Sequence, residues 1–270
     1  MKPRASNEDF HSLLKTAHDL ADLSGPAVLP HFRKPVPIDN KAGAGAFDPV
    51  TKADRAAERV IAKALKSRYP GHGIVGEEYG SRNGDGRYSW VIDPIDGTRA
   101  YIMGSPMWGT LIGLLDNGQP CLGLMDQPFT GERFWSGANS SYVQVRGAPP
   151  KKIKTRACAK LEDATLTTTH PDLFDAPGQK KAFDRLKSTA RMTRFGGDCY
   201  HYCLLAAGFV DLIIEAGLKT YDIVALIPII EKAGGCVTTW TGGPAMDGGD
   251  IIASGDARIH NAAIKMLAGR

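Results

Sequence analysis

With 270 residues, 43% of them hydrophobic, the chain can bury one large core or two closely packed halves. Its net charge of +4, from 33 Lys and Arg against 29 Asp and Glu, is small and scattered, which gives little support to a nucleic-acid partner. No apolar run approaches the ~20 residues of a membrane span and the polar N-terminus lacks a signal-peptide core, so we expect a cytoplasmic protein without a membrane partner.

The five cysteines are odd in number and form no CxxC pair, which favours reduced thiols over a disulfide framework. Cys199, His201 and Cys203 lie close enough in sequence to suggest a zinc site. On a helix, however, Cys199 and Cys203 share a face and His201 lies well round from it. We therefore interpret the two cysteines as buried structural thiols.

The first part of the chain predicts two amphipathic helices joined by a loop. Apolar residues recur at helical spacing over residues 10–21, and a capping-box pattern at Thr51-Lys52-Ala53-Asp54 begins a second helix that Tyr69-Pro70-Gly71 ends. Residues 35–47 are rich in Pro, Gly and Ala, and no strand leads into their glycines. We expect a mobile loop there instead of a phosphate cradle, with Asp48 at its junction with the second helix.

Acidic residues then follow two short predicted strands. Glu77 and Glu78 end the strand over residues 73–76, where adjacent carboxylates form either a solvated turn or a cation site. Asp93 and Asp96 end the strand over residues 88–92, and Pro94 would allow a helical turn to bring both carboxylates to one side. Asp-Pro and Asp-Gly are also ordinary turn formers, so a purely structural interpretation of this run stays open.

The remaining segments predict an antiparallel meander over residues 110–145 and alternating strands and helices from residue 164 onward. Pro149-Pro150-Lys151-Lys152 marks the expected boundary between an N-terminal α+β half, residues 1–150, and a C-terminal αβ half, residues 151–270. Asp222 lies at a predicted helix start in the second half, where it could serve as a plain N-cap.

Taken together, these motifs resemble the inositol monophosphatase superfamily of magnesium-dependent, lithium-sensitive phosphatases. The resemblance covers nearly the whole chain, and four motifs in register carry it: Asp48-Pro49-Val50-Thr51-Lys52-Ala53-Asp54, Gly76-Glu77-Glu78, Asp93-Pro94-Ile95-Asp96-Gly97-Thr98, and Tyr221-Asp222 with Glu231-Lys232-Ala233-Gly234-Gly235. It implies an α/β fold with αβαβα layers, a homodimer, and a small phosphate monoester as substrate.

The resemblance also implies roles for individual residues. One Mg²⁺ would be held by Glu77, Asp93 and the carbonyl of Ile95, a second by Asp93, Asp96 and Asp222, and a third, weaker ion would share Glu77. Asp48 and Thr98 would orient and deprotonate the attacking water, with Glu78 close by, and the amides of Gly97 and Thr98 would hold phosphate oxygens. An all-oxygen ligand set independently suits magnesium better than zinc.

Further residues are similar to the histidinol-phosphate phosphatase branch of this superfamily. They are Arg99 after the central motif, Gly197 and Asp198 in Phe195-Gly196-Gly197-Asp198-Cys199-Tyr200, and Glu215 before Tyr221-Asp222. Asp198 and Glu215 would give a cationic leaving group two anionic partners, and Arg99 would lie near the phosphate or the polar tail of the substrate. Asp198 could instead cap the helix that follows it.

Two other functions stay open. The chain could be a broad phosphatase of inositol or sugar phosphates, or a non-catalytic regulator or nucleic-acid binder on the same fold. The complete acidic set and the absence of a basic stripe with interleaved aromatics argue against the second.

Overall fold

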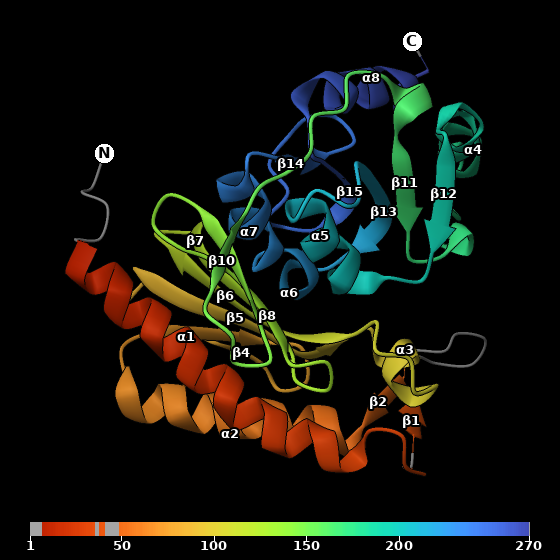
Figure 1. Ribbon diagram of the computed structural model, residues 1–270. Coiled ribbons are helices and arrows are strands. Elements are labelled where there is room, and N and C mark those ends of the chain that lie inside the picture. The colour runs from red at the N-terminus through yellow and green to blue at the C-terminus, as the bar shows by residue number, and fades with distance from the viewer. Residues whose placement is uncertain (1–6, 36–37, 41–48, 270) are drawn as a thin grey trace.

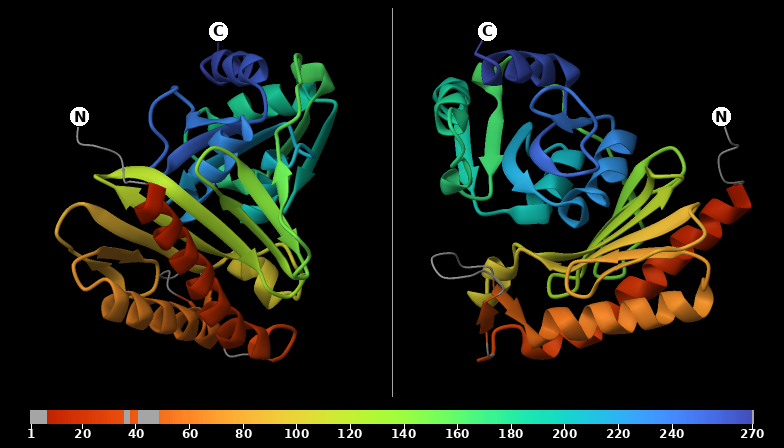
Figure 2. Two further views of the ribbon diagram at one scale, coloured as in Figure 1. Left: turned by 60° about the vertical axis from the view of Figure 1, so that its left-hand side comes forward. Right: turned by 180° about the vertical axis from the view of Figure 1, so that it is seen from behind.

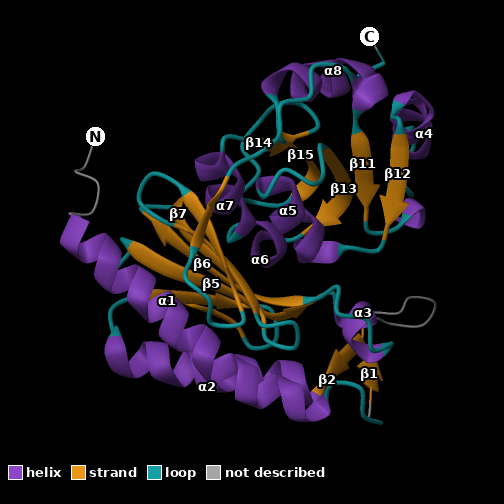
Figure 3. Ribbon diagram, viewed as in Figure 1, coloured by secondary structure: helices purple, strands orange, loops and turns teal. Residues whose placement is uncertain are grey.

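The computed structural model describes residues 7–35, 38–40 and 49–269 as alternating layers of helices and sheets (Figure 1). An outer layer of helices α1 (Asn7–Val28) and α2 (Lys52–Arg68) covers an eight-stranded sheet. A middle layer of α5 (Asp198–Ala206), α6 (Thr220–Ile223) and α7 (Leu226–Ala233) separates it from a five-stranded sheet, which α4 (Gln179–Thr189) and α8 (Ala257–Leu267) cover. The expected αβαβα layering is confirmed (Figure 3).

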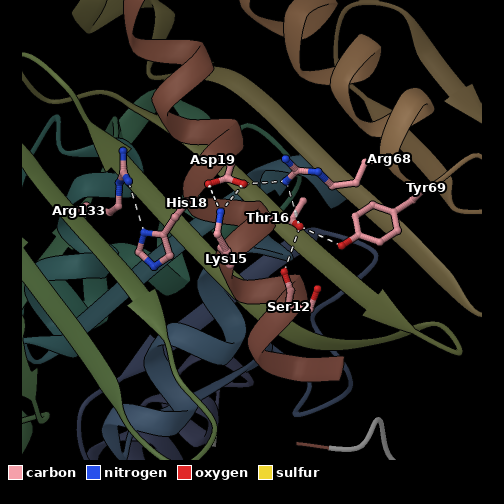
Figure 4. Close-up of polar contacts among 8 residues, drawn as sticks. All are labelled: Ser12, Lys15, Thr16, His18, Asp19, Arg68, Tyr69 and Arg133. Carbon is pink, nitrogen blue, oxygen red and sulfur yellow. Dashed lines mark hydrogen bonds and ion pairs between the residues drawn. The ribbon is translucent and has the colours of Figure 1, made fainter. Parts of the chain in front are cut away.

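The α1–α2 layer forms because each helix has one apolar face. The view from behind shows both helices along the outer face of the first sheet (Figure 2). Thr51 and Asp54 make the expected capping box at the start of α2. Polar contacts hold α1 in place: Arg68 of α2 binds Asp19 at 2.8 Å within the helical layer, and the Arg133 guanidinium on the first sheet contacts His18 at 3.3 Å (Figure 4).

The first sheet has the order β10-β9-β8-β7-β6-β5-β3-β4, and only the β3–β5 pair is parallel. Its strands are β3 (Gly73–Gly76), β4 (Gly80–Arg82), β5 (Tyr88–Asp96), β6 (Gly109–Asp116), β7 (Gln119–Gln127), β8 (Glu132–Ser136), β9 (Ser141–Val145) and β10 (Lys151–Ile153). The expected meander is confirmed in β6 to β9. Side chains of this sheet share one core with α1 and α2, including Leu20, Ile61, Trp90, Ile92, Ile112 and Leu114.

The second sheet has the order β12-β11-β13-β15-β14. Its strands are β11 (Thr165–Thr168), β12 (Met192–Phe195), β13 (Leu212–Leu218), β14 (Cys236–Thr239) and β15 (Gly249–Ser254). The short elements outside the two sheets are the β1 (Ile38–Asn40) and β2 (Pro49–Thr51) pair, α3 (Thr98–Ile102), and the 3₁₀ helices Leu29–His31, Leu161–Asp163 and Pro171–Leu173. None of the helices in the described part of the chain combines the length and apolar character needed to cross a lipid bilayer.

Two local expectations are wrong. No helical turn starts at Pro94, because β5 continues through Asp96 and α3 begins only at Thr98. The helix predicted to start near Asp222 is divided into two, α6 and α7. The division of the chain near residue 150 stays a prediction, although β10, which follows Pro149-Pro150, still pairs with β9 in the first sheet.

Candidate active site

A β-bulge in β5 brings Asp93 and Asp96 together. Asp93 lies opposite Leu111 and Asp96 opposite Gly109, so a step of three residues on β5 matches a step of two on β6. Residues three apart on a regular strand point to opposite faces, and the additional residue removes that alternation. Carboxylate oxygens of Asp93, Asp96 and Asp222 consequently lie within 4.8 Å of one another.

Hydrogen bonds fix the bulge. The Thr110 hydroxyl donates to the carbonyl of Pro94 at 2.8 Å, the Ile95 amide donates to Asp93 Oδ1 at 3.0 Å, and the Thr98 hydroxyl donates to the carbonyl of Ile95 at 3.0 Å. Thr110 and the Ile95 side chain are fully buried. The bulge is therefore a rigid feature of the sheet, and Thr110, which the sequence motifs do not mark, is one of its supports.

Asp222 reaches the cluster from the second half of the chain. It is the third residue of α6, not the N-cap, and its Oδ2 accepts the Lys219 amide at 2.6 Å in a capping-box arrangement. Capping and participation in the acidic cluster are therefore compatible roles for one carboxylate. Because α6 contacts β5, the second half of the chain completes the cluster.

Asp96 also joins β5 to α5. Its Oδ2 accepts the Cys199 amide at the start of α5 at 2.6 Å. The alternative role of Asp198, as a cap of this helix, is wrong, because Gly197 occupies the N-cap position, no side chain caps the helix there, and Asp96 accepts the Cys199 amide. Asp198 instead has φ 41°, a left-handed conformation that is costly for a residue other than glycine.

Glu77 and Glu78 form the turn between β3 and β4. Burial is the largest cause that raises the pKa of Asp93. Glu77 raises this pKa further through charge repulsion and a carboxyl–carboxyl hydrogen bond. The Glu78 amide donates to Glu58 Oε2 at 2.7 Å and the Tyr79 amide to Glu58 Oε1 at 3.0 Å. Glu77 thus belongs to the acidic cluster, whereas Glu78 lines neither of the cavities described next.

Two cavities meet at the cluster. A cavity of about 320 Å³ is lined by Glu215, Tyr202, Leu218 and Lys219, and one of about 710 Å³ by Thr98, Met103, His170 and Phe195. Both share the walls formed by Glu77, Asp96, Arg99, Thr169, Asp198 and Asp222. Asp93, Ile95 and Gly97 line the larger cavity. The cluster therefore stands at a junction with room for a ligand on either side.

The backbone conformation at residue 97 requires glycine. Gly97 is the N-cap of α3 with φ 86°, and a Cβ there would lie 2.8 Å from the Met107 carbonyl oxygen and 3.2 Å from Asp198. Only glycine adopts this conformation without strain and without a clash. Gly97 thus allows β5 to turn into α3 directly against the first residue of α5.

Ionisation of all carboxyl groups in the cluster is unfavourable without a cation. Burial raises the pKa of Asp93 and Asp96 well above the usual range, with neighbouring carboxylates adding to it. Burial also raises the pKa of Asp198 to about 6, of Asp222 to about 7 and of Glu215 to about 8. Converging oxygen ligands whose ionisation is this costly fit hard cations such as Mg²⁺.

The sequence motifs did not predict that two acidic residues of α2 support the site. Asp54 Oδ1 lies 3.5 Å from the Thr98 hydroxyl, in addition to the expected cap, and Glu58 holds the turn that carries Glu77. A signal for both existed, because they fall on the same helical face as the buried Ala57, Ile61 and Leu65.

Not every candidate residue can be placed in this site. Asp48 lies outside the described residues, and so does most of the expected loop at residues 35–47. Cys199 and Cys203 are buried free thiols, and within the described ranges they form no metal-ligand group with His201. The His201 imidazole packs instead against Gly197, where a Cβ would lie 1.9 Å from its Cγ.

The chain matches the model of the inositol monophosphatase family over residues 9–268 and belongs to that family. It is 42% identical to the bifunctional phosphatase IMPL2, chloroplastic, of Arabidopsis thaliana, over 98% of this chain and 80% of that protein. It is 33% identical to a histidinol-phosphatase of Mycobacterium tuberculosis, over 81% and 84% of the two chains. The structure of an inositol monophosphatase from Zymomonas mobilis superposes with a TM-score of 0.84 at 40% identity, over 98% and 100%.

This membership makes the chain a phosphatase of a generally magnesium-dependent family that acts on small phosphate monoesters. The resemblance inferred from the sequence motifs, including its histidinol-phosphatase relatives, is confirmed. Relatives and structures of both names, histidinol-phosphatase and inositol monophosphatase, are found, so family membership alone does not select the substrate.

Proposed function

We propose that the protein is a magnesium-dependent phosphatase that hydrolyses histidinol phosphate to histidinol and phosphate, a step of histidine biosynthesis. The observation that carries this proposal is the pairing of an acidic cluster with a smaller cavity that contains two more acids, Asp198 and Glu215. A phosphate dianion needs cations at one end, and a cationic leaving group needs carboxylates at the other.

Glu77, Asp93 and the Ile95 carbonyl would hold one Mg²⁺, and Asp93, Asp96 and Asp222 a second, with Glu77 shared by a third, weaker ion. When bound, these ions supply charge neutralisation for the phosphate dianion and its leaving oxygen and make water more acidic. The fit rests on oxygen ligands that converge and on carboxyl groups whose burial raises their pKa.

The reacting water would be oriented from the first half of the chain. Thr98 lines the larger cavity, and its hydroxyl donates to the Ile95 carbonyl, which leaves the lone pairs of Oγ1 available to accept from a water. We propose that this oxygen holds the water with Asp48, which takes its proton, and that Glu78 lies close by. The Gly97 and Thr98 amides would bind phosphate oxygens.

The leaving group would occupy the smaller cavity. Glu215 is buried and accepts from the Thr169 amide at 2.7 Å and the Thr169 hydroxyl at 3.0 Å. With its pKa raised to about 8, this carboxyl ionises readily near pH 7 only beside a cation. The ammonium and imidazole of histidinol can provide such a partner, whereas inositol offers neutral hydroxyls. Gly197 and Arg99 would complete this end of the site, with Arg99 offsetting the charge of Asp198.

The test is a comparison of kcat/KM for histidinol phosphate and inositol 1-phosphate, each with Mg²⁺ and with EDTA. We expect Mg²⁺-dependent turnover of both phosphate esters and a clear preference for histidinol phosphate. More efficient hydrolysis of inositol 1-phosphate would refute the substrate assignment and favour a broad inositol or sugar phosphatase.

We also propose a homodimer and a cytoplasmic location, following the family expectation. Light scattering coupled to size exclusion measures the oligomeric state, and a monomer at micromolar concentration would contradict the first of these proposals.

A further inference from the structure

Glu58 is a buried carboxylate that no step of the proposed reaction uses. It lies on the inner face of α2 and is only 2% exposed. Its oxygens accept the consecutive amides of Glu78 and Tyr79, at 2.7 and 3.0 Å. A buried carboxylate is costly unless it is well hydrogen-bonded, so these bonds to the turn are strong interactions.

The Glu58 carboxyl group packs directly against Gly76. A Cβ at Gly76 would lie 2.0 Å from Glu58 Oε1 and 2.5 Å from its carboxyl carbon. Gly76 is the last residue of β3 and pairs with Gly80 of β4, so the carboxylate fits directly beneath the turn. The absence of a side chain at residue 76 is what allows α2 to reach the backbone of this turn.

We propose that Glu58 is a positioning residue that fixes the turn and thereby aims Glu77 at the acidic cluster. This inference rests on the proposed function, in which Glu77 is a Mg²⁺ ligand. Holding the amides of residues 78 and 79 sets the direction of the backbone that leaves Glu77. Both Glu58 oxygens face N–H donors, so a glutamine would point its NH₂ group at one of those donors and lose that bond.

The experiment compares E58Q and E77Q with I61V, which removes one methyl group from a fully buried residue on the same helix and serves as the control for general destabilisation. Calorimetric titration of each metal-free protein with MgCl₂ measures the affinity without substrate. We expect about 10- to 100-fold weaker Mg²⁺ binding in E58Q, the range usual for a partner that orients a metal ligand. I61V should bind Mg²⁺ like the wild type.

Hydrogen exchange provides a readout that needs neither metal nor activity. The Glu78 and Tyr79 amides should exchange slowly in the metal-free wild type, and faster in E58Q, while I61V leaves them protected. If E58Q does not fold, the wild-type measurement still decides, because rapid exchange at both amides would overturn the inference.

The outcomes separate this inference from the proposed function. Weaker Mg²⁺ binding in both E58Q and E77Q supports it. Weaker binding in E77Q with wild-type binding in E58Q overturns the role of Glu58 and keeps the metal site. Wild-type binding in E77Q refutes the proposed metal site itself, and with it the purpose assigned to Glu58.

Discussion

Glu215→Gln should change how the stability of the protein depends on pH. Glu215 on β13 is buried, and its oxygens accept from Thr168 and Thr169. Burial raises its pKa from 4.5 to about 8, although the bonds from Thr169 oppose the rise. Glutamine has nearly the same shape and resembles the protonated acid, so the variant isolates the cost of ionising this group.

The sign follows from which state binds the proton. Between pH 4.5 and pH 8 the folded protein keeps the Glu215 proton and the unfolded chain releases it, so this group lowers the stability as the pH rises through that window. At ~1.4 kcal/mol per pKa unit, the full loss is on the order of 5 kcal/mol above pH 8. E215Q should therefore match the wild type near pH 4.5 and exceed its free energy of unfolding by several kcal/mol at pH 8.5.

Urea unfolding of the metal-free proteins from pH 4.5 to pH 9 measures this difference, because titrating groups that do not interact with Glu215 cancel between the two chains. E162Q, which changes an exposed glutamate, is the matched control and should run parallel to the wild type. Wild-type and E215Q curves that stay parallel over the whole range would refute the reasoning, since Glu215 would then ionise at its ordinary pKa.

Three further changes test the site. D93N removes a charge from the acidic cluster while keeping its shape, so Mg²⁺-dependent turnover should fall by more than about 100-fold in a phosphate-release assay, and near-normal turnover would contradict the metal assignment. G97A forces a Cβ into a left-handed conformation and toward the Met107 carbonyl, which should cost about 1–2 kcal/mol or more in urea unfolding, and unchanged stability would argue against this turn. T110V removes the hydroxyl that donates to the Pro94 carbonyl. We expect about 1–3 kcal/mol lower stability and a higher Mg²⁺ concentration for half-maximal activity. If both quantities stay at their wild-type values, the bulge does not need this bond.

Local sequence signals were enough for most of the fold. The Thr51–Asp54 capping box, the apolar faces of α1 and α2, and the turn-separated strands of the meander each depend on residues close in sequence, and the structure has all of them. The division of residues 220–233 into α6 and α7 was missed, because the helical pattern there continues across the break.

The arrangement of the site depends on contacts that sequence spacing does not encode. The sequence left open that Asp198 caps α5, but Asp96, 103 positions before Cys199, accepts the Cys199 amide instead. The grouping of Asp93 with Asp96 was expected for the wrong reason, a helical turn at Pro94. A strand that pairs with β6 produces the same grouping only through a bulge, and a bulge is a property of two strands together.

The bulge in β5 has a consequence for how this site can change over evolutionary time. Gain of one residue in β6 between Gly109 and Leu111 would match the step of three on β5, restore regular pairing and turn one of the two carboxylates to the other face of the sheet. The protein with regular strand pairing would then be the inactive one. Selection on this site therefore acts on the relative number of residues in the two paired strands as well as on the identity of those residues.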